Sequence, residues 1–278
     1  MHPSVSVIIP SYNRSRVLPR AINSVMAQTS PVAEIIVIDD GSTDASAELI
    51  KSRFPQVCLI QQANHGVSHA RNQGIAAASG EWIALLDSDD EWLPEKIETQ
   101  LAALQRSPEF LLCHSDEQWI RRGVRVNAMN KHRKYGGWIF EKCLPLCAIS
   151  PSASLLHHSL FDKYGLFDEQ LPACEDYDLW LRLCAYEPVL YVDQTLIKKY
   201  GGHEDQLSGK FWGMDRFRIR ALEKLLKQSE LPDNYRTLSQ QMLNKKLKIF
   251  IHGGLKRGRT DAMQPYIQLQ QQLQAHLV

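Results

Sequence analysis

Residues 84–92 read ALLDSDDEW and carry the chain from an apolar run directly into three carboxylates, those of Asp87, Asp89 and Asp90. Like charges at the end of a buried strand repel one another, and each loses part of its hydration. A bound cation would offset both effects. The stretch therefore predicts a buried strand that ends at a cation-binding edge of a sheet.

The first half of the chain alternates strand-like and helix-like segments. Apolar spacing typical of helices occurs at residues 18–26 and 97–104. Nearly continuous apolar runs, which suit strands covered on both faces, occur at residues 5–10, 34–39, 57–61, 82–87 and 110–115. This alternation predicts βαβ units with right-handed crossovers, and hence an α/β fold with a largely parallel sheet flanked by helices.

The composition is that of an ordinary globular protein, with 278 residues of which 44% are hydrophobic and 23% charged. The net charge of +1 gives no indication of a nucleic-acid partner. The N-terminus lacks a signal-peptide pattern, and no apolar run approaches the roughly 18 residues of a spanning helix. Six scattered cysteines suit reduced thiols. We therefore expect a cytoplasmic protein without a transmembrane segment.

The pattern loosens beyond residue 116. Residues 116–160 are rich in cations, which indicate either contacts with an anionic ligand or a solvated face. Residues 209–278 read as three helices. We expect one domain over residues 1–208 and a helical C-terminal extension over 209–278, whose mildly basic surface is either solvated or attached peripherally to an anionic membrane.

Polar residues follow three of the expected strands. The first strand ends in PSYNR, the second in DDGSTD and the fourth in DSDDEW. In an open α/β sheet, ligands bind outside the carboxyl ends of the strands, so these three segments should meet at one edge.

Four segments together resemble family 2 glycosyltransferases of the GT-A fold. They are SVIIPSYNR (6–14), IIVIDDGSTD (35–44), GVSHARNQGIAAASGEWIALLDSDDEWLPEKIE (66–98) and CEDYDLWLRL (174–183). The resemblance covers about residues 4–205 and implies a Rossmann-like, mixed and mostly parallel sheet. It also implies a nucleotide-sugar half over about residues 1–115 and an acceptor half over about 116–208.

The resemblance implies a metal site at the Asp-x-Asp motif, with Asp89 on the metal and Asp87 directed to the ribose or to metal-bound water. Hard oxygen ligands suit Mn²⁺ or Mg²⁺. Asp90 is expected to cap the helix that follows Pro94; the alternative is that it is a third partner at the metal site. His203 resembles the histidine that completes the metal or diphosphate site in some relatives; otherwise it is an exposed loop residue.

The resemblance also implies a nucleotide site. Asp40 matches the acidic residue that accepts a hydrogen bond from the base, with Pro10 and Tyr12 lining the base pocket. A carboxylate facing a pyrimidine N–H favours uracil over cytosine. Arg71 matches a position near the nucleotide, and Asn72 and Gly74 are expected to serve packing and the helix start.

Glu175 and Asp176 match the family's Glu-Asp pair at the start of a helix. We expect Asp176 to be the base that takes the acceptor's proton and Glu175 to orient it. The alternative is that Asp176 merely caps the helix, because Asp is a preferred cap.

These features predict an inverting, metal-dependent transferase that moves a sugar from a UDP-sugar, or another nucleotide-diphospho-sugar, to a hydroxyl of a glycan or lipid-linked acceptor. Family analogy suggests cell-surface polysaccharide or lipopolysaccharide synthesis at the inner face of the membrane. Two alternatives are a nucleotidyltransferase and a catalytically silent nucleotide-sugar-binding protein. The first would require a Gly-rich loop after the first strand, where PSYNRSRVL has no glycine.

Overall fold

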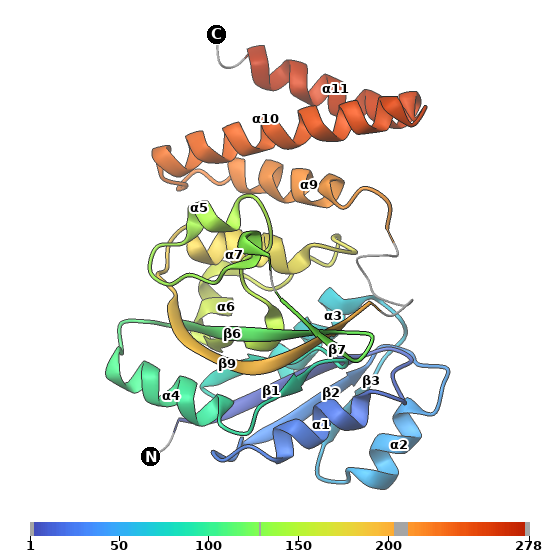
Figure 1. The fold of residues 1–278 in the computed structure, drawn as a ribbon, viewed down its shortest axis with the longest axis vertical. Helices are drawn as coiled ribbons and strands as arrows, with labels where there is room; N and C mark the ends of the chain where they lie inside the picture. Colours follow the sequence, from blue (N-terminus) through green and yellow to red (C-terminus); the bar gives the residue numbers. More distant parts are fainter. Residues whose placement is uncertain (1–2, 128, 203–210, 276–278) are drawn as a thin grey trace.

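A mixed sheet organises the computed structural model, which describes residues 3–127, 129–202 and 211–275. In this part of the chain nine strands form one sheet in the order β3-β2-β1-β4-β8-β6-β9-β5, with β7 paired to β6 (Figure 1). The strands are β1 (Val5–Ser11), β2 (Glu34–Asp39), β3 (Cys58–Gln61), β4 (Trp82–Leu85), β5 (Glu91–Trp92), β6 (Leu112–Arg121), β7 (Val124–Val126), β8 (Leu155–His157) and β9 (Leu190–Gly201).

The pairing confirms the predicted mixed, mostly parallel sheet. Strands β3, β2, β1 and β4 are parallel to one another, and β6 is parallel to β9. Strand β8 lies antiparallel between β4 and β6, and β5 is antiparallel to β9. The sequence did not reveal that β6 continues to Arg121, because its outer half is polar and only partly buried.

Helices cover both faces of the sheet. They are α1 (Leu18–Met26), α2 (Ser46–Arg53), α3 (Val67–Ala77), α4 (Lys96–Arg106), α5 (Phe140–Cys143), α6 (Ser159–Tyr164) and α7 (Glu175–Cys184), with 3₁₀ turns η1 (Asn130–His132) and η2 (Pro151–Ala153). Side chains alternate across β1: Val7 and Ile9 pack with α1 and α4, whereas Ile8 packs with α3 and α7. The parallel strands are therefore buried on both faces, as their apolar runs predicted.

Three further helices follow the sheet: α9 (Asp215–Leu226), α10 (Asp233–Lys256) and α11 (Thr260–Ala275). They are stacked above α7 in Figure 1, and one apolar cluster runs from Ile8 of the sheet to Met263 of α11. The predicted division at residue 208 falls outside the described residues and stays a prediction. Among the described helices, none is both long and apolar enough to span a membrane.

Helices α10 and α11 are separated by residues 257–259, where Gly258 has φ 69°. Helix α10 continues through Gly253 and Gly254 to Lys256. A Cβ on Gly254 would lie 2.1 Å from Sδ of Met263, so this glycine lets α10 and α11 cross closely. Packing between helices thus outweighs the low helix propensity of glycine here.

Gly74 allows the same close approach between α3 and the sheet. A Cβ at this position would lie 2.4 Å from Cγ2 of Ile8 and 2.7 Å from Cδ1 of Ile38. Its predicted packing role is confirmed, but the helix starts at Val67, so neither Asn72 nor Gly74 marks a helix start.

We expect Gly74→Ala to lower the free energy of unfolding by about 1–2 kcal/mol, because overpacking exceeds the roughly 1 kcal/mol that alanine gains in helix propensity. Urea unfolding measures this loss. Gln73→Ala, on the exposed side of the same helix, is the control and should stay within about 0.5 kcal/mol of wild type. Equal stability of the two variants would contradict the tight packing of α3.

Candidate active site

One cavity of about 450 Å³ opens at the carboxyl ends of β1, β2 and β4. Every predicted site residue that the structure describes lines it: Pro10, Tyr12, Asp40, Arg71, Asp87, Asp89, Glu175 and Asp176. His203 lies outside the described residues. The convergence predicted from the polar strand ends is therefore found in the structure.

The loops after β1 and β2 are held together by side-chain hydrogen bonds. Asn13, in a left-handed conformation with φ 53°, accepts the backbone N–H of Thr43 at 2.8 Å through Oδ1. Its own N–H donates to Oγ of Ser42 at 2.8 Å. Gly41 has φ 77°, which favours glycine, and a Cβ there would lie 2.8 Å from N of Asn64. These contacts fix the edge at which Tyr12 and Asp40 face the cavity.

Asp40 is buried and fixes the loop of residues 62–66. Its Oδ1 accepts hydrogen bonds from Nε2 of Gln62 at 2.7 Å and from N of His65 at 2.8 Å. Its Oδ2 accepts the N–H of Gly66 at 2.8 Å. An ionised carboxylate offers about four acceptor positions, and these described groups occupy three of them. Tyr12 is 44% exposed and lines the same cavity as Asp40.

Asp90 does not cap a helix, and that prediction is wrong. Helix α4 begins at Lys96, with Glu95 as its N-cap residue. The Asp90 carboxylate is buried, where it accepts Oγ–H of Ser152 at 2.6 Å and the N–H of Tyr200 at 3.0 Å. Burial raises the pKa of Asp90 well above its usual range, the charges of Asp87 and Asp89 raise it further, and Lys199 opposes them.

Arg71 joins the two acidic segments of the cavity. Its Nη1 donates to Oε1 of Glu175 at 2.6 Å, and its Nη2 donates to Oδ1 of Asp87 at 2.7 Å. The guanidinium also lies 5.1 Å from the ring of Phe167. Burial alone would lower its pKa, but the two carboxylates outweigh burial and raise it. Arg71 is therefore a permanent buried cation between Asp87 and Glu175.

Glu175 and Asp176 begin α7. Cys174 is the N-cap residue, in a left-handed conformation with φ 62°, so Asp176 is the second helical residue and not the cap. Its Oδ1 accepts the N–H of Tyr177 at 2.7 Å, and its Oδ2 accepts the thiol of Cys147 at 3.0 Å. Burial raises the pKa of Glu175; Arg71 lowers it and Asp176 raises it. Near a helix N-terminus, the amide dipoles favour ionised carboxylates.

Sequence reasoning did not single out several residues of the cavity lining, among them Cys147, Lys199, Met214 and Arg218. Lys199 Nζ donates to Oγ of Ser150 at 3.1 Å. Burial would lower the pKa of Lys199, but Glu117, Asp90 and Asp87 outweigh it and raise the pKa. Lys199 could have been found from the alternation of side chains along β9, because it lies two residues after buried Ile197 and therefore on the same face of the strand. No sequence signal pointed from α9 back to this cavity.

Asp87 and Asp89 supply hard oxygen atoms to the cavity. Within residues 3–127, 129–202 and 211–275, no group of three or more His, Cys, Asp or Glu residues forms a pre-built metal site. Mg²⁺ and similar ions commonly bind through one or two protein carboxylates together with substrate phosphates. The donor set therefore fits a divalent ion that is held jointly with a diphosphate.

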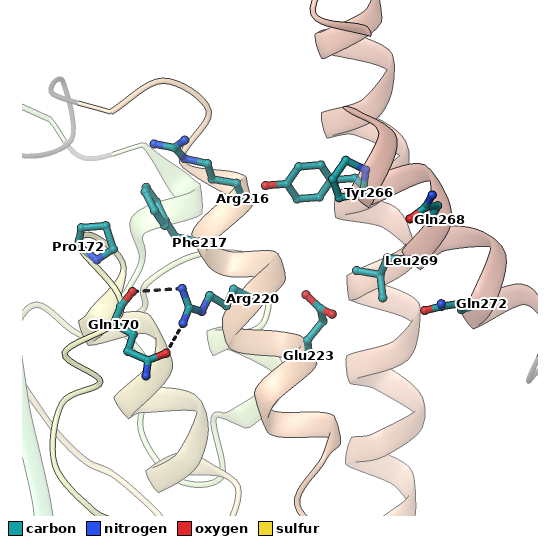
Figure 2. Close-up of a pocket in the computed structure, with 11 residues that line it drawn as sticks. Gln170, Pro172, Arg216, Phe217, Arg220, Glu223, Tyr266, Gln268, Leu269 and Gln272 are labelled. Atoms are coloured by element: carbon teal, nitrogen blue, oxygen red, sulfur yellow. Dashed lines mark hydrogen bonds between the residues drawn. The ribbon is translucent and has the colours of Figure 1, made fainter. Parts of the chain in front are cut away.

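A larger cavity of about 720 Å³ lies between α9 and α11 (Figure 2). Arg220, Glu223 and Tyr266 line it, and Arg220 donates hydrogen bonds to the backbone and side-chain oxygens of Gln170. The described residues predicted for the site lie in the smaller cavity instead.

Comparison with known proteins decides the family. Residues 6–165 match glycosyl transferase family 2. The chain belongs to this family. It is 33% identical over 201 residues to an uncharacterized glycosyltransferase of Rickettsia typhi, covering 70% of this chain and 63% of that protein. It is 42% identical over 116 residues to the uncharacterized glycosyltransferase YibD of Escherichia coli, covering 40% of this chain and 34% of YibD.

Solved structures show the same fold. Staphylococcus aureus TarS, residues 1–349 in complex with UDP-GlcNAc, superposes with a TM-score of 0.70 at 18% identity, covering 88% of this chain and 71% of that one. The complex of the same TarS fragment with UDP gives a TM-score of 0.65 at 21% identity, covering 88% and 70%. The predicted GT-A fold is confirmed. This family 2 chain spans about 63% of the length of its Rickettsia typhi relative.

We expect Arg71→Met to lower the free energy of unfolding by about 3 kcal/mol or more, because it leaves Asp87 and Glu175 without their buried counter-ion. Without Arg71, the pKa of Glu175 rises further above its unfolded value. A carboxyl group whose pKa is raised in the folded protein stabilises the fold only while it is protonated. The loss of unfolding free energy in Arg71→Met should therefore grow as pH rises above about 5. Unfolding by urea at pH 5 and pH 8 measures both effects.

The double variant Arg71→Met/Glu175→Gln is the matched control, because it removes the buried charge that Arg71 compensates. It should recover part of the lost stability at pH 8 and reduce the pH dependence. A deficit that is the same at both pH values and in both variants would contradict the bridging role of Arg71.

Proposed function

We propose that this family 2 chain transfers a sugar from a UDP-sugar to a hydroxyl group of an acceptor, with inversion at the sugar carbon. The observation that carries the proposal is the meeting of separate polar segments in one cavity, which collects residues after β1, β2 and β4 and at the start of α7. Family membership and the fold of the UDP-GlcNAc complex of TarS support it.

The β1–β2 side of the cavity is assigned to the nucleotide. Tyr12 offers an exposed aromatic face, and Asp40 keeps one acceptor position beside the loop that it holds. A base that presents an N–H to a carboxylate satisfies this position, which favours uracil over cytosine. Pro10 forms part of the same wall.

Asp89 and Asp87 are assigned to a divalent cation, Mn²⁺ or Mg²⁺, as the donor set allows. When bound, such an ion would stabilise the negative charge of the departing diphosphate. Arg71 orients Asp87, since its Nη2 donates to Oδ1 of that carboxylate at 2.7 Å. Asp90 is buried next to Asp89 in the sequence, and its hydrogen bonds to Ser152 and Tyr200 fix the loop after β4.

Asp176 is assigned as the base. It takes the proton of the acceptor hydroxyl while the oxygen attacks the sugar carbon and the bond to the diphosphate breaks. Cys147 donates to one of its oxygens, and the N–H of Tyr177 donates to the other, which fixes the carboxylate at the helix start. Glu175, held by Arg71, is a positioning residue.

The two alternative functions, a nucleotidyltransferase and a silent nucleotide-sugar-binding protein, are affected differently by these findings. Membership of family 2 argues against a nucleotidyltransferase. A silent nucleotide-sugar-binding protein would bind UDP through the same cavity, and only turnover distinguishes it from the proposed enzyme.

We expect Asp176→Asn to reduce sugar transfer by about 100- to 10,000-fold, because the amide cannot accept a proton. The Kd for UDP should change by less than about twofold, since the nucleotide lies at the other side of the cavity. Single-turnover transfer and calorimetry measure the two quantities. Asp162→Asn, an exposed aspartate of α6, is the control. Substantial transfer by Asp176→Asn would remove it as the base.

We expect wild type to bind UDP more tightly than GDP or dTDP in the presence of Mn²⁺, and to lose most of this affinity in EDTA. Asp89→Ala should raise the Kd for UDP with Mn²⁺ by at least about tenfold and leave the weak binding in EDTA unchanged. Calorimetric titration measures both, with Asp162→Ala as the control. If chelation has no effect on wild type, the metal assignment fails. If GDP is preferred, the assignment of Asp40 to a uracil base fails; preference for dTDP would keep the contact with Asp40, because thymine carries the same ring N–H.

A further inference from the structure

A further cavity, distinct from the one between α9 and α11 and called the second cavity below, adjoins the candidate active site. It has a volume of about 410 Å³ and lies between the start of α9 and the second half of α10. Met214 and Arg218 line both this cavity and the candidate active site, so the two share one wall. The residues of this second cavity lie beyond the part of the chain that matches the family, residues 6–165.

The second cavity is positively charged. Among the described residues that line it, Arg218, Arg257 and Arg259 carry guanidinium groups, and Asp215 carries a carboxylate. Asp215 already accepts from Nη1 of Arg218 at 2.9 Å and from Nζ of Lys246 at 3.2 Å. The sequence has no Asp or Glu from residue 234 to residue 260. An anionic ligand is therefore the complement of this cavity.

An aromatic platform lies among these cations. The Trp212 ring is 40% exposed and stacks on Phe250, with ring centroids 5.8 Å apart and an interplanar angle of 14°. Cζ of Arg259 lies 4.3 Å from the Trp212 ring, and Cζ of Arg216 lies 4.9 Å from it. Guanidinium groups that are ordered on an aromatic ring keep their N–H donors directed outward, which suits two-point contact with phosphate.

Three glycines let the walls of this cavity pack closely. Gly213 has φ 63°, and a Cβ there would lie 2.7 Å from Cε2 of Phe250. Gly253 and Gly254 line the wall on α10, where a Cβ would meet Nη1 of Arg257 at 3.0 Å and Sδ of Met263 at 2.1 Å. The glycines therefore fix how Phe250 and Arg257 lie along the cavity.

The shared wall leads towards the proposed base. The backbone oxygen of Met214 accepts a weak hydrogen bond from Sγ of Cys174 at 3.9 Å, and Cys174 directly precedes Glu175 and Asp176. The described carboxylates predicted for the donor, the metal and the base line the first cavity, whereas the second is basic. A molecule in the second cavity would thus lie next to the base and apart from the donor nucleotide.

We infer that the second cavity binds the phosphate group of an anionic acceptor, with Arg218, Arg257 and Arg259 as the phosphate contacts. The acceptor hydroxyl then passes Met214 to reach Asp176. This inference rests on the proposed function for the role of the ligand, but not for the binding of phosphate itself. The phosphate belongs either to a lipid-linked acceptor or to a soluble phosphorylated glycan.

The test uses calorimetry on the full chain with saturating UDP, so that the nucleotide cavity is filled. The probes are geranyl phosphate, inorganic phosphate and the neutral alcohol geraniol. Arg257→Gln/Arg259→Gln removes two cations of the second cavity. Lys245→Gln/Lys248→Gln is the matched control, because it removes the same charge from exposed positions of α10 that do not line the cavity.

Wild type should bind a phosphate probe and not geraniol. Arg257→Gln/Arg259→Gln should weaken this binding at least about tenfold, and the lysine control by less than about threefold. Preference for geranyl phosphate over inorganic phosphate assigns a lipid-linked acceptor, and equal binding of both assigns a soluble phosphorylated one.

Equal losses in the two double variants would overturn the inference, because diffuse charge would then explain the binding. Failure of wild type to bind either phosphate probe would overturn it too. UDP affinity is measured in a separate titration of each protein and should be unchanged in both double variants, which also shows that they are folded. Absence of UDP binding in wild type would contradict the proposed function alone, since the comparison between the double variants does not depend on UDP.

Discussion

The ion pairs of Arg71 with Asp87 and Glu175 are the interaction on which the candidate site depends. They connect a loop after β4 with the start of α7, two segments that are far apart in the sequence. The buried carboxylate of Glu175 and the partly exposed carboxylate of Asp87 would repel each other without a cation between them, and the buried guanidinium of Arg71 holds both at the cavity. The remaining parts of the site, from the Asp40 loop to the Asp90 turn, are arranged around this bridge.

Local patterns were sufficient to predict the α/β fold, and together with the family resemblance they indicated eight residues of the cavity lining. The apolar runs at residues 5–10 and 34–39 became central strands, because strands buried on both faces need continuous apolar side chains. The sequence also predicted that the polar strand ends meet, since parallel strands end at one edge of a sheet. Asp40, Asp89 and Asp176 do line one cavity.

Contacts between distant segments could not be predicted. Asp90 looked like a cap because only its neighbours in sequence were known; its partners Ser152 and Tyr200 lie 62 and 110 residues away. Arg218 reaches the cavity from α9, and nothing in its own segment indicates that direction; for Lys199, the period of two along β9 indicates a face of the strand but not the cavity. The continuation of α10 through Gly254 likewise depends on Met263 of another helix. Such positions are decided by tertiary packing and not by local propensity.

The residues assigned to the donor and the residues of the second cavity come from different parts of the sequence. The residues assigned to the donor lie before residue 177, and the residues of the basic cavity lie after residue 211. In the enzyme that we propose, substitutions in α9 and α10 would change which acceptor reaches Asp176 and leave the residues assigned to the donor in place. In such an arrangement, new acceptor preferences can evolve by exchange of a terminal helical module.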